Sequence, residues 1–154
     1  MKIERVSDVD LEEIRAFLRE ADLTLAGLEA PTVQLWIERD KCGEIVGSAG
    51  FELSANRKHA LIRSVAVAQQ RRSAGAGSRL AKFALERAHE AGATRAWLFS
   101  RRSGPFWQNL GFTRADREQL AATLPDTHQV LLFVETGQLD RKVAWSRSLS
   151  DDAR

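Results

Sequence analysis

The first part of the chain alternates apolar and polar positions in a way that predicts a strand followed by a helix. Met1–Val6 alternates polar with apolar residues, which is typical of a half-buried strand. Ser7 then offers a helix N-cap with acidic residues just after it, and apolar residues at helical spacing continue to about Glu20. We expect the apolar stripe of this helix to contact the core.

Three strand-like runs follow this helix. They are Thr32–Arg39, Glu44–Leu53 and His59–Val67. The first two are joined by Asp40–Gly43, which is short enough for an antiparallel hairpin in which Gly43 supplies a positive φ.

The second half of the chain alternates helical and extended signals. Apolar residues at helical spacing follow Ser78, and Gly92 is a candidate left-handed C-terminal cap for that helix. The remaining predicted elements are a buried strand over Ala96–Phe99, a short helix from Pro105 to Asn109, an extended segment from Gly111, and a final pair of strands over Gln129–Val134 and Lys142–Ser148.

This order of elements predicts an α+β protein with a mixed sheet covered by helices. The 154 residues, 44% of them apolar and 29% charged, have the composition of a folded globular protein. We expect one domain over residues 1–149 and a frayed tail over residues 150–154. Because 23 basic residues face 21 acidic ones, the net charge of +2 gives only weak support for nucleic-acid binding.

Several other function classes are disfavoured by simple features of the sequence. No apolar run approaches the roughly 20 residues of a membrane helix and the N-terminus has no apolar signal core, so we expect a cytoplasmic protein without a membrane contact. Cys42 is the single cysteine, and His59, His89 and His128 are too scattered for a metal site by spacing, so no metal is expected. We expect a monomer or a homodimer.

The most informative segment is Val65–Leu80, in which the strand that ends at Val67 leads through a loop of small residues into the helix that begins near Ser78. A loop of small residues that enters a helix directs free backbone N–H groups and the helix dipole at one point, which favours phosphate. Gly75 and Gly77 lack a Cβ, so a pyrophosphate can approach the main chain there. The spacing matches neither the P-loop nor the dinucleotide fingerprint, so a phosphate site and an ordinary glycine-containing turn remain the two interpretations.

Two motifs resemble those of the GNAT superfamily of N-acetyltransferases. Arg72–Gly77 resembles its acyl-CoA pyrophosphate loop (Gln/Arg-x-x-Gly-x-Gly/Ala), and Phe106–Phe112 resembles its second motif, aromatic-aromatic-x-x-x-Gly-Phe. Within the superfamily, Gly50–Leu53, Leu61–Val67 and Gln129 are similar to the small acetyltransferases found with arsenic-resistance genes. The resemblance covers nearly the whole chain and implies a mostly antiparallel sheet that splays in the middle, with helices on both faces.

The resemblance also implies a reaction, in which acetyl-CoA lies in a V-shaped opening between the strand ending near Val67 and the strand Ala96–Phe99. One main-chain N–H of Val65 or Val67 would polarise the thioester carbonyl. The acceptor would be the amine of a small molecule, such as an amino-acid-like toxin or antibiotic, that attacks directly in a ternary complex. The implied cofactor-binding residues are Val65, Ala66, Val67, Arg72, Ser73, Ala74, Gly75, Ala76, Gly77, Ser78, Phe106 and Trp107.

Two charged residues stand in apolar strands and are candidates for the acceptor side of the site. Glu52 is a hypothesis for the general base, directly or through water, and the alternative is a solvent-facing residue of an amphipathic strand. Arg63 requires a partner if it is buried, so either Glu52 neutralises it or it holds a substrate carboxylate or oxyanion. Arg63 and Ser64 are the predicted substrate-binding residues, and His128 is an alternative base.

The chain departs from the superfamily pattern at the position of the general acid. Many members protonate the leaving CoA thiolate with a tyrosine, but this chain has no tyrosine and carries Trp107 there, whose indole N–H is too weak an acid. Water or Ser103 would then supply the proton, or the thiolate leaves unaided. A non-catalytic acyl-CoA-binding module is therefore the alternative function. A third hypothesis, a nucleic-acid binder, would use Arg71, Arg72, Arg79, Arg101 and Arg102.

Overall fold

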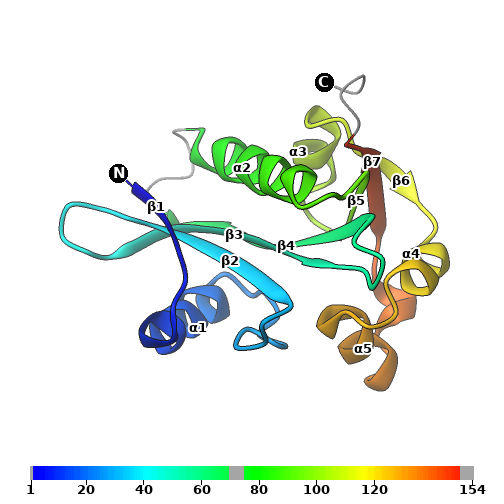
Figure 1. Cartoon of the computed structure of the whole chain (residues 1–154), viewed down its shortest axis with the longest axis horizontal. Coiled ribbons are helices and arrows are strands. Elements are labelled where there is room, and N and C mark those ends of the chain that lie inside the picture. The colour runs from blue at the N-terminus through cyan, green and yellow to red at the C-terminus, as the bar shows by residue number, and fades with distance from the viewer. Residues whose placement is uncertain (1, 70–74, 150–154) are drawn as a thin grey trace.

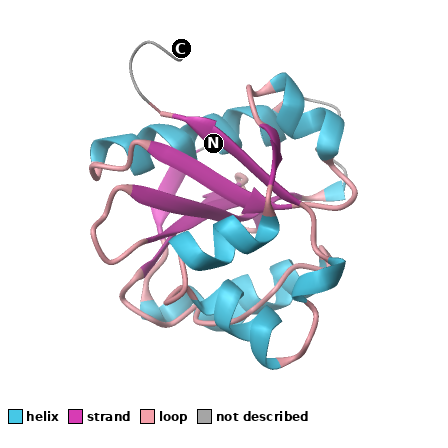
Figure 2. Ribbon diagram, turned by 90° about the vertical axis from the view of Figure 1, so that its right-hand side faces the viewer, coloured by secondary structure: helices cyan, strands magenta, loops and turns pink. Residues whose placement is uncertain are grey.

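The computed structural model describes residues 2–69 and 75–149, and these form one sheet between two layers of helices (Figures 1 and 2). The strands are β1 (Lys2–Arg5), β2 (Val33–Arg39), β3 (Ile45–Leu53), β4 (His59–Val67), β5 (Arg95–Phe99), β6 (Thr113–Ala115) and β7 (Ala144–Ser148). The helices are α1 (Leu11–Glu20), α2 (Ala76–Glu90), α3 (Gly104–Asn109), α4 (Arg117–Thr123) and α5 (His128–Glu135), with single 3-10 turns at η1 (Asp8–Asp10) and η3 (Leu139–Arg141).

The sheet has the strand order β1-β2-β3-β4-β5-β7-β6 and is mostly antiparallel. The β4 and β5 pair is parallel, because α2 carries the chain back along the sheet between these two strands. Figure 1 shows α2 and α3 on one face of the sheet and α1 and α5 on the other. The predicted fold class, a mixed α+β protein with helices on both faces, is confirmed.

The start of the first helix follows the sequence prediction closely. Asp10 accepts hydrogen bonds from the backbone N–H and the hydroxyl of Ser7, at 2.9 and 3.1 Å, which forms a capping box. Arg39 of β2 also donates to Asp10, over 2.9 Å. These contacts fix the entry of the helical segment against the sheet, so that its buried residues Ile14 and Leu18 face the core.

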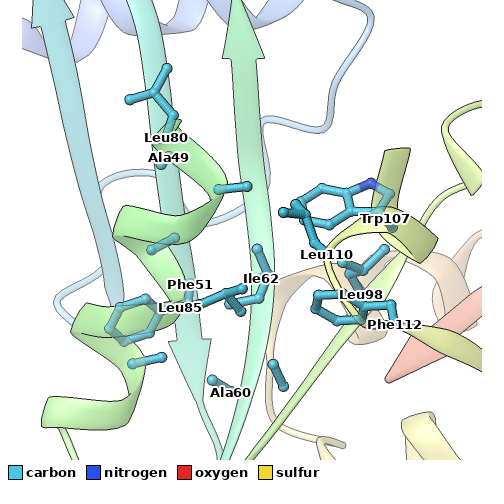
Figure 3. Close-up of a cluster of buried hydrophobic side chains, with 14 of the residues drawn as sticks. Ala49, Phe51, Ala60, Ile62, Leu80, Leu85, Leu98, Trp107, Leu110 and Phe112 are labelled. Atoms are coloured by element: carbon cyan, nitrogen blue, oxygen red, sulfur yellow. The ribbon is translucent and has the colours of Figure 1, made fainter. Parts of the chain in front are cut away.

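The main core lies between α2 and the sheet (Figure 3). Leu80 and Leu85 of α2 lie over Phe51 and Ile62 of the sheet, and all four side chains are buried. Truncation of a leucine as buried as Leu80 to alanine costs about 2–5 kcal/mol of stability. The α2 helix is thereby held in one place over β3 and β4, which matters because its first turn borders the candidate site.

One predicted element is wrong: Gln129–Val134 is part of the helix α5 and is not a strand. A short apolar run does not distinguish a buried strand from a buried helix, and its surroundings decide. Thr127 has the extended conformation of an N-cap, and Val130 and Phe133, three residues apart, point into the core while the residues between them are more exposed. The strand β7 pairs with β5 on one side and with β6 on the other, and not with residues 129–134.

Candidate active site

The sheet opens between β4 and β5, as the resemblance to the acetyltransferase superfamily implies. These parallel strands are paired only from His59 to Leu61 on β4, opposite Arg95 to Trp97 on β5. From Ile62 onward β4 has no strand on its β5 side within the described ranges. An extended ligand can therefore lie along that side of β4 in the manner of an added strand.

A bulge in β4 sets which side chains face which layer at this opening. The register against β3 shifts between Ser48 and Gly50, and Ser64 on β4 has a positive φ of 60°. The Ser48 hydroxyl donates to the carbonyl of Ser64 over 2.6 Å, which stabilises the unusual backbone. Ile62 packs on the α2 side of the sheet, and in a regular strand Ser64 would be the next side chain on that side. Because of the bulge, Val65 and Val67 pack there instead.

The first turn of α2 lies beside the end of β4. Gly75, the N-cap, has a left-handed backbone with φ 75°, a conformation that glycine adopts without strain. A Cβ on Gly77 would lie 3.6 Å both from Val67 and from Phe106 of α3. Three residues that the sequence assigned to the coenzyme, Gly77, Val67 and Phe106, are thus brought together. The predicted coenzyme residues Arg72, Ser73 and Ala74 lie outside the described residues.

The two aromatic residues of the second motif have different environments. Trp107 is buried in the main core and makes edge-to-face contacts with Phe106 and Phe112, with ring centroids 4.9 and 5.4 Å apart. Phe106 is partly buried and faces the first turn of α2. Of the two, Phe106 borders the opening, whereas Trp107 supports it from the core side.

Two arginines of the suggested basic surface are engaged in ion pairs. Arg79, in the first turn of α2, donates to both carboxylate oxygens of the buried Glu38, at 2.7 and 3.0 Å, and this hydrogen bonding raises the pKa of Arg79. Arg102, after β5, pairs with Asp22 at 3.1 Å on the surface. The Arg79 pair anchors the first turn of α2 to β2, so its guanidinium serves the fold.

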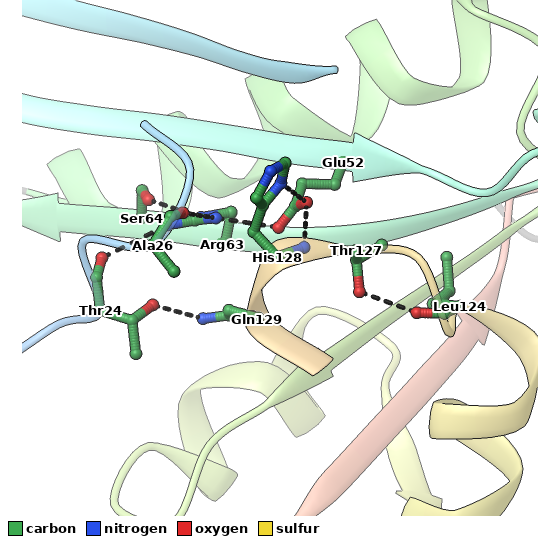
Figure 4. Close-up of polar contacts among 9 residues, drawn as sticks. All are labelled: Thr24, Ala26, Glu52, Arg63, Ser64, Leu124, Thr127, His128 and Gln129. Carbon is green, nitrogen blue, oxygen red and sulfur yellow. Dashed lines mark hydrogen bonds and ion pairs between the residues drawn. The ribbon is translucent and has the colours of Figure 1, made fainter. Parts of the chain in front are cut away.

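A second polar cluster lies on the opposite face of the sheet, away from α2 (Figure 4). Glu52 of β3 and Arg63 of β4 form an ion pair with 2.8 Å between Oε2 and Nη1, and their side chains are 1% and 0% exposed. They are diagonal neighbours, because Glu52 lies directly opposite Leu61. Burial lowers the pKa of Arg63, and the attraction of Glu52 opposes that effect.

The rest of the Arg63 guanidinium is also satisfied by hydrogen bonds. It donates to the carbonyls of Ala26 and Thr24, at 2.7 and 3.3 Å, and to the hydroxyl of Ser64 at 3.2 Å. The sequence left open whether Arg63 pairs with Glu52 or holds a substrate carboxylate or oxyanion, and in the structure it pairs with Glu52. It ties the loop before β2 to the bulge of β4.

His128, the first residue of α5, completes this cluster. Its backbone N–H donates to Oε1 of Glu52 over 2.6 Å, and its Nδ1 lies 3.0 Å from the same oxygen. The adjacent Gln129 donates to the hydroxyl of Thr24 over 2.9 Å, while its Oε1 is buried without a hydrogen-bond partner among the described residues. Because the α5 segment was predicted as a strand, the contact of His128 with Glu52 was not foreseen. The available signal was Thr127, an N-cap residue directly before the apolar run.

Residues 2–69 and 75–149 contain neither a candidate metal centre nor a candidate membrane helix. No group of three or more histidine, cysteine, aspartate or glutamate side chains there is placed to hold a metal ion. In the same ranges, no helix is both long enough and apolar enough to cross a membrane.

Comparisons with known proteins identify the class of this fold. Residues 3–112 match the acetyltransferase (GNAT) family, and this match spans more than half of the chain. The protein therefore belongs to the GNAT family and is an acetyltransferase. Comparison with curated proteins finds no significant match.

Solved structures agree with this assignment at the level of the fold. The chain is similar to an acetyltransferase of the GNAT family from Staphylococcus aureus Mu50, with 18% identity and a TM-score of 0.75 over 97% of this chain and 99% of that one. It is also similar to Rv2747 of Mycobacterium tuberculosis in complex with CoA, with 16% identity and a TM-score of 0.76 over 97% and 100% of the two chains. N-acetylglutamate synthase of Neisseria gonorrhoeae, complexed with coenzyme A and N-acetyl-glutamate, has 22% identity and a TM-score of 0.76, over 97% of this chain but 35% of that longer one.

Proposed function

We propose that this protein is an acetyl-CoA-dependent N-acetyltransferase that transfers the acetyl group to the amine of a small molecule, by direct attack in a ternary complex. The observation that carries the proposal is the opening between β4 and β5, which the first turn of α2 and Phe106 border. Family membership supports the reaction class, and the CoA complexes of the mycobacterial and gonococcal proteins support the cosubstrate.

The described residues fit a coenzyme at this opening. Beyond Leu61, the β5 side of β4, where Val65 lies, faces no neighbouring strand among the described residues and can receive a pantetheine arm. Gly77 leaves space beside Phe106 that a larger side chain would fill. No acidic residue lies in the first turn of α2, so the positive end of its helix dipole, near Ser78, can face a diphosphate without repulsion.

In this proposal the chemistry requires polarisation of the thioester and removal of a proton from the acceptor. An N–H near the bulge at Ser64 would stabilise the negative charge that builds on the carbonyl oxygen. Glu52 belongs to the proton-removing machinery, but its carboxylate is 1% exposed and both of its oxygens already accept hydrogen bonds. We therefore expect Glu52 to act through a neighbouring group.

The acceptor would approach from the face of the sheet that carries Glu52, between the loop before β2 and the start of α5. The finer similarity to the arsenic-resistance-associated acetyltransferases, which includes Gln129, would make the acceptor an amino-acid-like toxin or antibiotic and remains part of the proposal.

The coenzyme site is tested by filling the space beside Phe106. A Gly77→Leu variant should bind CoA at least tenfold more weakly in isothermal titration calorimetry, a change of about 1.4 kcal/mol. Its melting temperature should not fall, since leucine is the better helix former by about 1 kcal/mol. Glu86→Leu, on the exposed side of the same helix, is the control and should bind CoA normally. Unchanged CoA affinity in Gly77→Leu would refute this placement of the coenzyme.

Turnover is tested by the release of free CoA thiol from acetyl-CoA in the presence of amino acids, aminoglycosides and polyamines. The proposal predicts acceptor-dependent thiol release and an N-acetylated product detected by mass spectrometry. Tight CoA binding without turnover for any acceptor would instead favour the acyl-CoA-binding module, which the absence of tyrosine keeps as the second candidate.

A further inference from the structure

We propose that His128 is the group that removes the proton from the acceptor amine, and that Glu52 is a positioning residue that holds the His128 imidazole. This inference rests on the proposed function and names the base of that reaction. It follows from three features: the hydrogen bonds that Glu52 makes, the accessibility of the imidazole, and the glycine over which the imidazole lies.

The hydrogen bonds determine which ring nitrogen of His128 is free. Glu52 is paired with the Arg63 guanidinium at 2.8 Å, so it is present as a carboxylate that can only accept hydrogen bonds. Nδ1 of His128, 3.0 Å from Oε1 of Glu52, is therefore the donor in that contact. In the neutral imidazole Nε2 then carries the lone pair, and this nitrogen can accept a proton.

Accessibility separates the two groups. The side chain of His128 is 34% exposed, whereas that of Glu52 is 1% exposed. A substrate amine can reach the imidazole without disturbing the buried ion pair, but it cannot reach the carboxylate. The base is therefore the exposed end of a chain of contacts that begins at Arg63 and passes through Glu52.

The loop before β2 is shaped around the imidazole. Gly27 has a φ of 72°, and a Cβ at this position would lie 2.3 Å from Cγ of His128. The ring thus lies directly against the backbone of Gly27. Glu29, on the same loop, is a second carboxylate that interacts electrostatically with His128. The contact of Nδ1 with Glu52 and the contact with Gly27 give the ring one defined orientation, which general-base catalysis requires.

The proposed step is balanced in protons and electrons. The acceptor R–NH3+ gives one proton to Nε2 of His128, and the neutral nitrogen forms a bond to the acetyl carbonyl carbon. The carbon–sulfur bond then breaks, and its electron pair leaves on the CoA thiolate. A second proton leaves the nitrogen through water and neutralises the thiolate, and the His128 imidazolium returns its proton to solvent. The products are the N-acetylated amine, CoA thiol and one proton.

A His128→Asn variant tests this role, because the asparagine amide can still donate to Glu52 near the former Nδ1 but has no basic nitrogen. With the best acceptor from the thiol-release panel, kcat should fall about a hundredfold or more, while KM for acetyl-CoA and the CoA affinity stay the same. The deficit should shrink as the pH approaches the ammonium pKa of that acceptor, since a neutral amine needs no base. A structural defect would give a deficit independent of pH.

The matched control is His59→Asn, at a histidine whose Nδ1 accepts a hydrogen bond from Trp97 at 3.1 Å outside this cluster, and its kcat should be unchanged. Nitrogen NMR of the imidazole in the unmodified protein gives an independent readout and should show the neutral tautomer protonated at Nδ1. Full turnover of His128→Asn, or a tautomer protonated at Nε2, would overturn the assignment of the base while acetyl transfer itself stands. Absence of turnover in the unmodified protein would overturn both.

Discussion

The buried ion pair between Arg63 and Glu52 makes the sharpest prediction about stability. Both side chains are withdrawn from water, and they meet at 2.8 Å. An Arg63→Met change keeps an apolar chain of similar length but leaves the Glu52 carboxylate buried without its cation. It also removes the donors to the carbonyls of Ala26 and Thr24. Breaking such a pair from one side costs about 3–5 kcal/mol, which corresponds to a fall in Tm of roughly 6–20 °C for a chain of this size.

The double variant separates an unpaired charge from a loss of packing. Glu52→Gln combined with Arg63→Met leaves no buried charge, so it should be no less stable than Arg63→Met alone, with a coupling free energy of about 2 kcal/mol or more. Urea unfolding followed by circular dichroism measures all the variants without ligand. Arg102→Met removes a partner from the exposed pair with Asp22 and should change stability by no more than about 0.5 kcal/mol. If Arg63→Met cost no more than this control, the account of the cluster would be wrong.

Two further predictions concern the start of the first helix and the loop beside His128. The backbone N–H of Ser7, together with Arg39, lowers the pKa of Asp10 below its ordinary value of 3.8. The ionised Asp10 side chain therefore stabilises the fold fully above pH 3.8, and this stabilisation is lost as the pH falls through the lower pKa of the folded state. Asp10→Asn keeps an acceptor oxygen but loses the charge that attracts Arg39, so it should lower the free energy of unfolding by about 1 kcal/mol at neutral pH. This difference from the unmodified protein, measured by urea unfolding, should disappear in acid; a difference of the same size at every pH would contradict this. Gly27→Ala should displace the His128 ring and strain a left-handed backbone, so we expect a loss of about 1–3 kcal/mol in urea unfolding and a lower kcat with CoA affinity unchanged; normal kcat would argue against a fixed imidazole.

Local patterns in the sequence were sufficient for most of the elements around the coenzyme opening. The strand that ends at Val67, the helix that follows Gly75 and the short helix containing Phe106 all have strong periodicity or strong end signals. The conclusion that the sheet opens came from the resemblance of two motifs to a known superfamily. The structure adds that the pairing of β4 with β5 stops at Leu61 and Trp97.

The acceptor side was poorly predicted, because its key element has an ambiguous sequence. The apolar run Val130–Val134 satisfies a strand and a helix equally, and no residue within it decides between them. Once this segment is a helix capped at Thr127, His128 comes to its first position, 76 residues along the chain from Glu52 yet in hydrogen-bond contact with it.

The sequence by itself determined the class of fold, the strands and helices beside the opening, and the presence of a glutamate and an arginine in apolar strands. Those features depend on residues near one another along the chain. Only the tertiary structure decided that Glu52 is paired with Arg63 and that His128 is the exposed member of their cluster. The physical reason is that a buried charge takes its partners from whatever the folded chain brings within about 3 Å, and these partners come from three separate segments.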